Sequence, residues 1–261
     1  MERLKRPPIV EAWVSLEFEP REDAPPWGFS TAARFIAKYA QEFPRAEWVA
    51  KQQVQLQAGS PKDVPQVVSR EVALETVRVF NEARTRWLQL RSDAIIYNVV
   101  EAGSAYPGFD RLREDGLAKF ADYIEHFNPK SVQNATICYL DVVEIPAGAD
   151  DIIQLEDYFT VVSPLPSEPF GNLMHFEFRH VFHCPVDDGP LVFVLQPVPS
   201  PREPHRVRFF MTWQKICTDV NTVDLATIRK RLDVSHEYLR QCFHAAVTPK
   251  TWQLFEPTPG E

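Results

Sequence analysis

The chain has 261 residues, of which 44% are hydrophobic and 25% charged, and its formal net charge at pH 7 is -8. This composition is typical of a globular protein with a core large enough to fold without disulfides or other covalent staples. The acidic balance argues against a protein that is basic throughout and follows a phosphate backbone, although a local basic patch remains compatible with nucleic-acid binding.

The cysteines and the N-terminal residues indicate in which cellular compartment the protein is expected. Cys138, Cys184, Cys217 and Cys242 are widely spaced, form no C-x-x-C pair and lie within apolar patterns. Such cysteines are typical of reduced core thiols in a cytoplasmic protein. The charged start of the chain precedes no apolar segment of the kind a signal peptide requires, and no apolar stretch approaches the length of a membrane span. We therefore expect a cytoplasmic protein that does not cross a membrane.

The first half of the chain shows the pattern strand, helix, antiparallel strands, helix. Alternation of apolar residues predicts the strands, and recurrence at three- and four-residue spacing predicts the helices. Ser30 or Thr31 is expected to cap the first helix, and Ser92-Asp93 to form a tight hairpin turn. The expected elements are a strand over residues 9–18, a helix over 30–43, strands over 72–80, 85–91 and 94–101, and a helix from Phe109 to Phe127.

The second half repeats this order. The expected elements are a strand over residues 132–145, a short helical piece over 151–159, strands over 173–184, 191–198 and 207–218, and a closing helix over 223–247. We interpret residues 1–261 as one compact α+β unit with two pseudo-repeated halves, approximately 1–128 and 129–261. Curved antiparallel sheets should be covered on one side by the long helices.

The closing helix carries a sustained apolar seam. Its members recur at alternating three- and four-residue steps: Leu225, Ile228, Leu232, Ser235, Leu239, Cys242 and Ala246. Packing of this seam against the chain's own sheet is the expected role. The alternative is a helix that binds a partner subunit, which would give self-association.

The strand over residues 175–184 has the densest group of reactive side chains. Alternation places His175, Glu177, Arg179 and His183 on one face and His180 on the other. At about 3.3 Å per residue, His175 and His183 are roughly 26 Å apart, which excludes a metal ion shared by them. His175 and Glu177 could form an acid–base pair, but a solvated face with Glu177 paired to Arg179 is favoured, and His180 is expected in the core.

Other reactive residues give no catalytic motif. His236, Arg240 and His244 recur at four-residue spacing, but nearby Cys242 lies on the apolar seam, which favours packing over a nucleophile. The sequence has no G-x-G-x-x-G, Walker A or G-x-S-x-G pattern. We therefore predict no catalytic residues, no cofactor and no metal site.

A basic triplet lies near the start of the closing helix. Arg229, Lys230 and Arg231 are most simply a solvated helix face, and their alternative role is contact with an anion or a nucleic acid. Nucleic-acid binding through this triplet is the least favoured hypothesis.

Several collinear segments resemble a sporadically distributed bacterial family of unknown function. They are residues 7–12, 91–98, 106–109, 137–146 and 238–243, with Thr248. The resemblance implies no catalytic residue, cofactor or substrate, and the sporadic distribution suggests a role in toxin neutralisation or phage defence. Family members tend to have an arginine-rich, glycine-containing strand where this chain has residues 136–146, so a function tied to those arginines is not expected here.

Taken together, these patterns favour a non-enzymatic interaction protein that binds another protein or itself through the closing helix. The alternative is a small-ligand receptor or an enzyme whose pocket lies between the sheet and its helices. The candidate ligand- or partner-binding residues are His175, Glu177, Arg179, His183, Arg229, Lys230 and Arg231.

Overall fold

The computed structural model describes residues 4–57, 66–100, 106–146, 153–162, 176–185, 187, 189–198 and 206–256. Its strands are β1 (Ile9–Glu19), β2 (Arg45–Gln57), β3 (Gln66–Phe80), β4 (Arg86–Leu90), β5 (Ala94–Val99), β6 (Ser131–Pro146), β7 (Phe178–His183), β8 (Pro190–Val198) and β9 (Arg206–Cys217). Its helices are α1 (Phe29–Ile36), α2 (Phe109–Phe127), α3 (Leu225–Ala246) and α4 (Pro249–Leu254), with 3₁₀ turns η1 (Ala37–Tyr39) and η3 (Leu155–Asp157).

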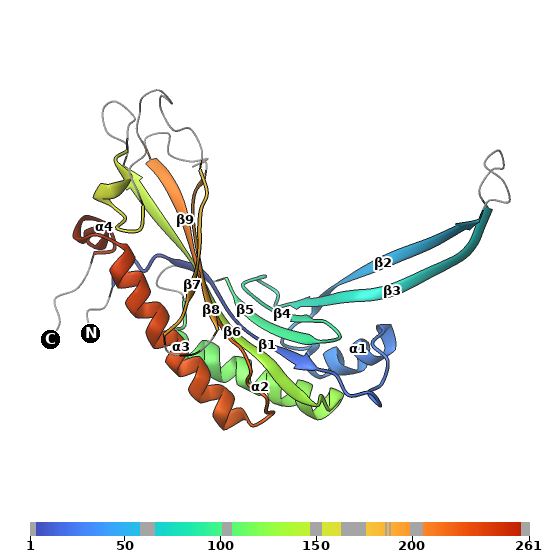
Figure 1. The fold of residues 1–261 in the computed structure, drawn as a ribbon. Helices are drawn as coiled ribbons and strands as arrows, with labels where there is room; N and C mark the ends of the chain where they lie inside the picture. The colour runs from blue at the N-terminus through green and yellow to red at the C-terminus, as the bar shows by residue number, and fades with distance from the viewer. Residues whose placement is uncertain are drawn as a thin grey trace.

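In the described part of the chain, the strands form one antiparallel sheet in the order β2-β3-β4-β5-β1-β6-β9-β8-β7. Figure 1 shows α1, α2 and α3 on one face of this sheet. The predicted α+β class is therefore confirmed. No helix among the described residues has the length and apolar character needed to span a membrane.

The centre of the sheet is β1, which pairs with β5 on one side and β6 on the other. Ala12, Val14 and Leu16 point to the helical face and are completely buried. The alternation that predicted this strand is confirmed, because the apolar side chains of a strand covered on one face recur every second residue.

Helices α2 and α3 cover the two halves of the sheet. Gly116 allows α2 to approach β1 closely, since a Cβ atom at this position would lie 2.5 Å from Cγ2 of Val14. On α3, Ile228, Leu232 and Leu239 are buried against β6 and β9. The apolar seam is thus part of the chain's own core, as expected.

The order of strands has a related form in the two halves. In each half the first strand pairs with the last strand of the same half, β1 with β5 and β6 with β9. The two first strands, β1 and β6, pair with each other. Among the described residues the second half has fewer strands than the first, and a true duplication stays a prediction.

Strand β2 was missed by the sequence prediction. It pairs with β3 along its whole length, and Figure 1 shows this hairpin extending beyond the helices as an arm. Trp48 and Val49, which are neighbours in sequence, are both more than a third exposed. Residues 45–51 of β2 are all exposed, so burial imposes no apolar alternation on this part of the strand.

The first helix differs from the prediction in length and in its cap. Helix α1 starts after Gly28 and continues as the short turn η1, so the helix does not reach residue 43. No side chain caps its N-terminus, and the Thr31 hydroxyl instead donates to the carbonyl of Pro26 at 3.1 Å. The capping role expected for Ser30 or Thr31 is wrong, because the helix begins before both residues. Helix α4, which was not predicted, follows α3 after Thr248 caps its start.

Candidate functional site

The side chains of the histidine-rich strand do not form a site in the described residues. His175 lies outside the described residues, whereas Glu177, Arg179 and His183 are exposed. Glu177 and Arg179, both of which the structure describes, form no ion pair with each other. As the last strand of the sheet, β7 has a neighbour on one side only.

His180 does not lie in the core as expected. It shares the face of Phe193 on the neighbouring β8, but it is exposed, and the two ring centroids are 6.3 Å apart. Phe182 on the same face is also 42% exposed. The strand alternation is correct, but the covering layer does not bury this edge of the sheet.

The basic triplet lies on the first turns of α3. Arg229 forms a two-point ion pair with Glu114 of α2, one of whose contacts is 2.6 Å long. Lys230 is exposed and Arg231 is half-buried. The charge of Arg229 therefore joins two helices of the same chain, which reduces its capacity to bind an outside anion.

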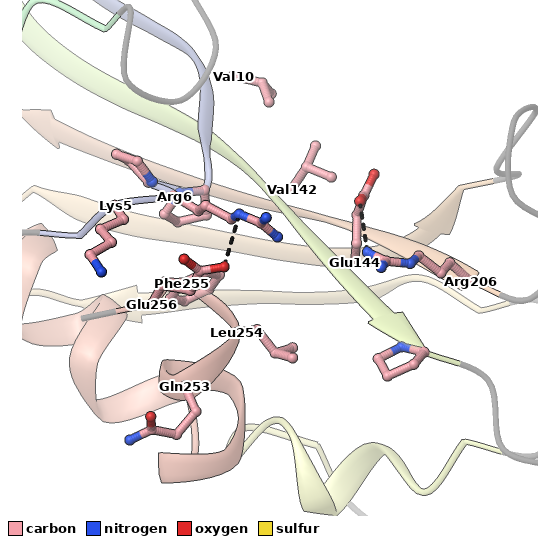
Figure 2. Close-up of a pocket in the computed structure, with 13 residues that line it drawn as sticks. Lys5, Arg6, Val10, Val142, Glu144, Arg206, Gln253, Leu254, Phe255 and Glu256 are labelled. Atoms are coloured by element: carbon pink, nitrogen blue, oxygen red, sulfur yellow. Dashed lines mark ion pairs between the residues drawn. The ribbon is translucent and has the colours of Figure 1, made fainter. Parts of the chain in front are cut away.

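Two shallow hollows on the described surface have walls that combine charged and apolar residues. Figure 2 shows the larger, of about 640 Å³, between the N-terminal segment, β6 and the end of α4. Two pairs of its charged groups form ion pairs, Arg6 with Glu256 at 3.0 Å and Arg206 with Glu144 at 3.6 Å. A second hollow, of about 560 Å³, lies on the sheet face opposite the helices and contains Trp13 and Trp87.

A smaller and more apolar cavity, which we call the α3 cavity, lies between the sheet and α3. Its volume is about 200 Å³. Its wall combines aromatic rings from several elements with a few polar groups: Leu4, Pro7, Pro8, Ile9, Tyr106, Tyr139, Asp141, Trp213, His236, Leu239, Arg240, Phe243, His244 and Trp252. An apolar cavity with a few convergent polar groups has the usual composition of a small-ligand site.

The N-terminal segment closes one side of the α3 cavity. The backbone N–H groups of Lys5 and Arg6 donate to the carbonyls of Glu256 and Phe255 at 3.2 and 3.1 Å. On the other side, the carbonyl of Pro8 accepts from the N–H of Val142 at 2.8 Å. These bonds hold the start of the chain between β6 and the end of α4.

Asp141 supplies a buried carboxyl group to this wall. Its residue is only 3% exposed, and it lies between Ile9 of β1 and Met211 of β9 in the sheet. Burial raises the pKa of Asp141 to about 8. The described residues provide it with no hydrogen bond or ion pair, so the unliganded protein favours the neutral carboxyl at pH 7.

Other side chains of the α3 cavity are held in place by contacts with their neighbours. The Tyr139 hydroxyl and Nδ1 of His236 share a hydrogen bond of 2.8 Å, and the His236 ring stacks on Phe109 at 4.0 Å between centroids. Burial lowers the pKa of His236, so its imidazole is neutral at pH 7. The guanidinium of Arg240 donates to the carboxylate of Glu237 at 2.9 and 2.7 Å.

Two further polar groups of the wall are buried, the hydroxyl of Tyr106 and the indole Nε1–H of Trp213. The Tyr106 hydroxyl interacts with the hydroxyl of Tyr139, and burial raises its pKa, so it remains protonated. The indole Nε1–H of Trp213 has no hydrogen-bond partner in the described part of the chain. Buried polar groups normally have such a partner, so this N–H suggests that a ligand or water completes the α3 cavity.

The sequence indicates some residues of this wall but not that they share a site. The four-residue spacing of His236, Arg240 and His244 places them on one side of a helix, and the nearby Cys242 gives no catalytic motif with them. The missed signal was Asp141, an acid on the inward face of an alternating strand, two residues after Tyr139. None of the described residues predicted to bind a ligand or partner lines this cavity. Within the described residues, no group of three or more His, Cys, Asp or Glu side chains is placed to hold a metal ion.

Comparisons with protein-family models, with curated proteins and with solved structures find no match for this chain.

Proposed function

We propose that this protein is a receptor for a small ligand, which binds in the α3 cavity. The observation that carries the proposal is that Asp141 and Trp213 line one apolar cavity, where the described residues give the Asp141 carboxyl no ion pair and the Trp213 indole N–H no hydrogen-bond partner. A buried carboxyl without a partner destabilises a folded protein, and such costs are typical of binding and catalytic sites. The proposal is one of binding, and it assigns no reaction to these groups.

A thermal-shift screen with a chemically diverse ligand set tests this function. A ligand that binds only the native state stabilises it by RT ln(1 + [L]/Kd), so Tm rises with the logarithm of the ligand concentration once this exceeds Kd. The variant Leu4→Trp introduces a large ring at the cavity wall and should abolish the shift. The variant Leu254→Trp is the control, because Leu254 is also partly buried but lines the larger hollow of Figure 2. A ligand shift that survives in Leu4→Trp would contradict the proposed site.

A second candidate function is binding of another protein, and the sheet edges favour it. Val181 is 63% exposed on the edge strand β7, and Trp48 lies exposed on the edge strand β2. Edge strands with apolar side chains can pair with a strand of another chain. Because the seam of α3 is buried, self-association through this helix would use its outer face, where Val234 is exposed. A role in toxin neutralisation or phage defence is proposed from the family resemblance alone.

Native mass spectrometry of the protein isolated from its host separates the two candidates. A stoichiometric protein companion supports the interaction function, whereas a bound small mass lost on Leu4→Trp substitution supports the receptor.

A further inference from the structure

The wall of the α3 cavity is mainly aromatic. Tyr106, Tyr139, Trp213, Phe243 and Trp252 contribute rings from five parts of the fold, and His236 adds a neutral imidazole. The faces of aromatic rings carry negative potential and attract cations, above all ammonium ions with carbon substituents.

The charged groups of the wall also favour a cation as the ligand. Asp141 is the one acidic group of the wall, and among the described residues it has no cationic partner. The titratable or cationic groups that share the cavity are Tyr106 before α2, Tyr139 on β6, and His236, Arg240 and His244 on α3. Arg240 is held by Glu237, and His236 is neutral at pH 7, which leaves the carboxylate able to balance a bound cation.

We propose that the α3 cavity binds a small organic ammonium ion that carries a hydroxyl or ether oxygen. The nitrogen lies beside the carboxylate of Asp141, its carbon substituents contact the rings, and the oxygen accepts from the indole N–H of Trp213. This inference rests on the proposed receptor function and names its ligand class.

The size of the cavity and its few polar groups narrow the class further. A cavity of about 200 Å³ holds a ligand somewhat larger than benzene, which fits an engineered cavity of about 150 Å³. A sugar of similar size has more hydroxyl groups than Asp141, Tyr106 and Trp213 can satisfy by hydrogen bonding. An anionic ligand would lie beside the acidic group of Asp141, and the guanidinium of Arg240 is already paired with Glu237, so an anion is disfavoured.

Isothermal titration with choline as the probe tests this proposal. Its uncharged carbon isostere, 3,3-dimethylbutan-1-ol, has nearly the same shape and lacks only the charge. We expect choline to bind at least tenfold more tightly than the isostere. The variant Asp141→Asn should lose at least tenfold in choline affinity while its affinity for the isostere stays the same. The variant Glu22→Gln makes the matching acid-to-amide change at an exposed position away from the cavity, and it should bind choline as the wild type does.

Binding should also release a proton, because the carboxyl must ionise beside the cation. Choline affinity is therefore expected to rise between pH 6 and pH 8, with a proton release that depends on buffer ionisation and is absent in Asp141→Asn. If a peptide that contains trimethyllysine displaces choline from the cavity, the ammonium ligand is supported and its source is a modified protein.

The outcomes separate this inference from the receptor function. Equal binding of choline and its isostere, tight glucose binding, or unchanged choline affinity in Asp141→Asn would overturn the ammonium ligand and leave a receptor. If neither choline nor any compound of a charge-diverse library binds at the α3 cavity, the receptor function itself fails.

Discussion

The substitution Asp141→Asn should make the protein more stable at neutral pH, because it removes a buried carboxyl group without a partner. Burial raises the pKa of Asp141 to about 8 in the folded state, and an aspartate in the unfolded chain has a pKa of about 3.9. As the pH rises from 4 to 8, the unfolded chain loses this proton first. The folded state then binds more protons than the unfolded state, so the free energy of unfolding falls across this window.

The size of the effect follows from the difference between the two pKa values. Each pH unit in the window costs about 1.4 kcal/mol of stability, which gives an upper bound on the order of 5 kcal/mol at pH 8. Asparagine has no such titration. We therefore expect Asp141→Asn to match the wild type near pH 4 and to exceed it by about 2 to 5 kcal/mol at pH 8, where water in the cavity accounts for the lower value.

Urea unfolding of both proteins at half-unit steps from pH 4 to pH 8.5 measures this difference. Other carboxyl groups titrate in both proteins and cancel in the comparison. The variant Glu22→Gln, which removes an exposed carboxyl, should run parallel to the wild type. If the stability difference between Asp141→Asn and the wild type does not depend on pH, the inference that burial raises the pKa of Asp141 is wrong.

Three further predictions concern the core. Gly116→Ala should lower the free energy of unfolding by about 1 to 3 kcal/mol in urea titrations, because the new Cβ atom meets Val14 at 2.5 Å. Lys215→Met should cost about 2 to 4 kcal/mol in the same assay, because the buried Lys215 ammonium pairs with Asp187 and donates to two backbone carbonyls. Burial raises the pKa of the Cys217 thiol to about 11, so a disulfide reagent should label it at pH 8 only after unfolding.

Matched controls accompany these predictions. A Cβ atom on Gly28 meets nothing within 4 Å, so Gly28→Ala should leave stability nearly unchanged. Lys250→Met removes a lysine whose ion pair with Asp157 is half exposed, so its cost should be much smaller than that of Lys215→Met. Equal losses in Gly28→Ala and Gly116→Ala, or in the two lysine variants, would contradict the packing and burial arguments. Rapid labelling of Cys217 in the native protein would show that its strand opens readily.

Local periodicity in the sequence determined most elements of this fold. Strand β1 and helix α2 each have one buried face, and the period of that face can be seen in the sequence. The period is two for Ala12, Val14 and Leu16, and three or four for Leu112, Gly116, Phe120 and Tyr123. The seam of α3 was readable for the same reason. In the β2–β3 arm the sequence predicted only β3, because residues 45–51 of β2 are exposed and no burial imposes a period on them.

Only the tertiary structure decided which residues share a site. The densest reactive segment in sequence, around His183, lies on an exposed edge strand, because strand order places β7 last in the sheet. Asp141 and Trp213 are 72 residues apart in the numbering, yet the pairing of β6 with β9 places Trp213 opposite Tyr139, two residues from Asp141. Such proximity depends on long-range strand pairing, which the local pattern of a sequence does not encode.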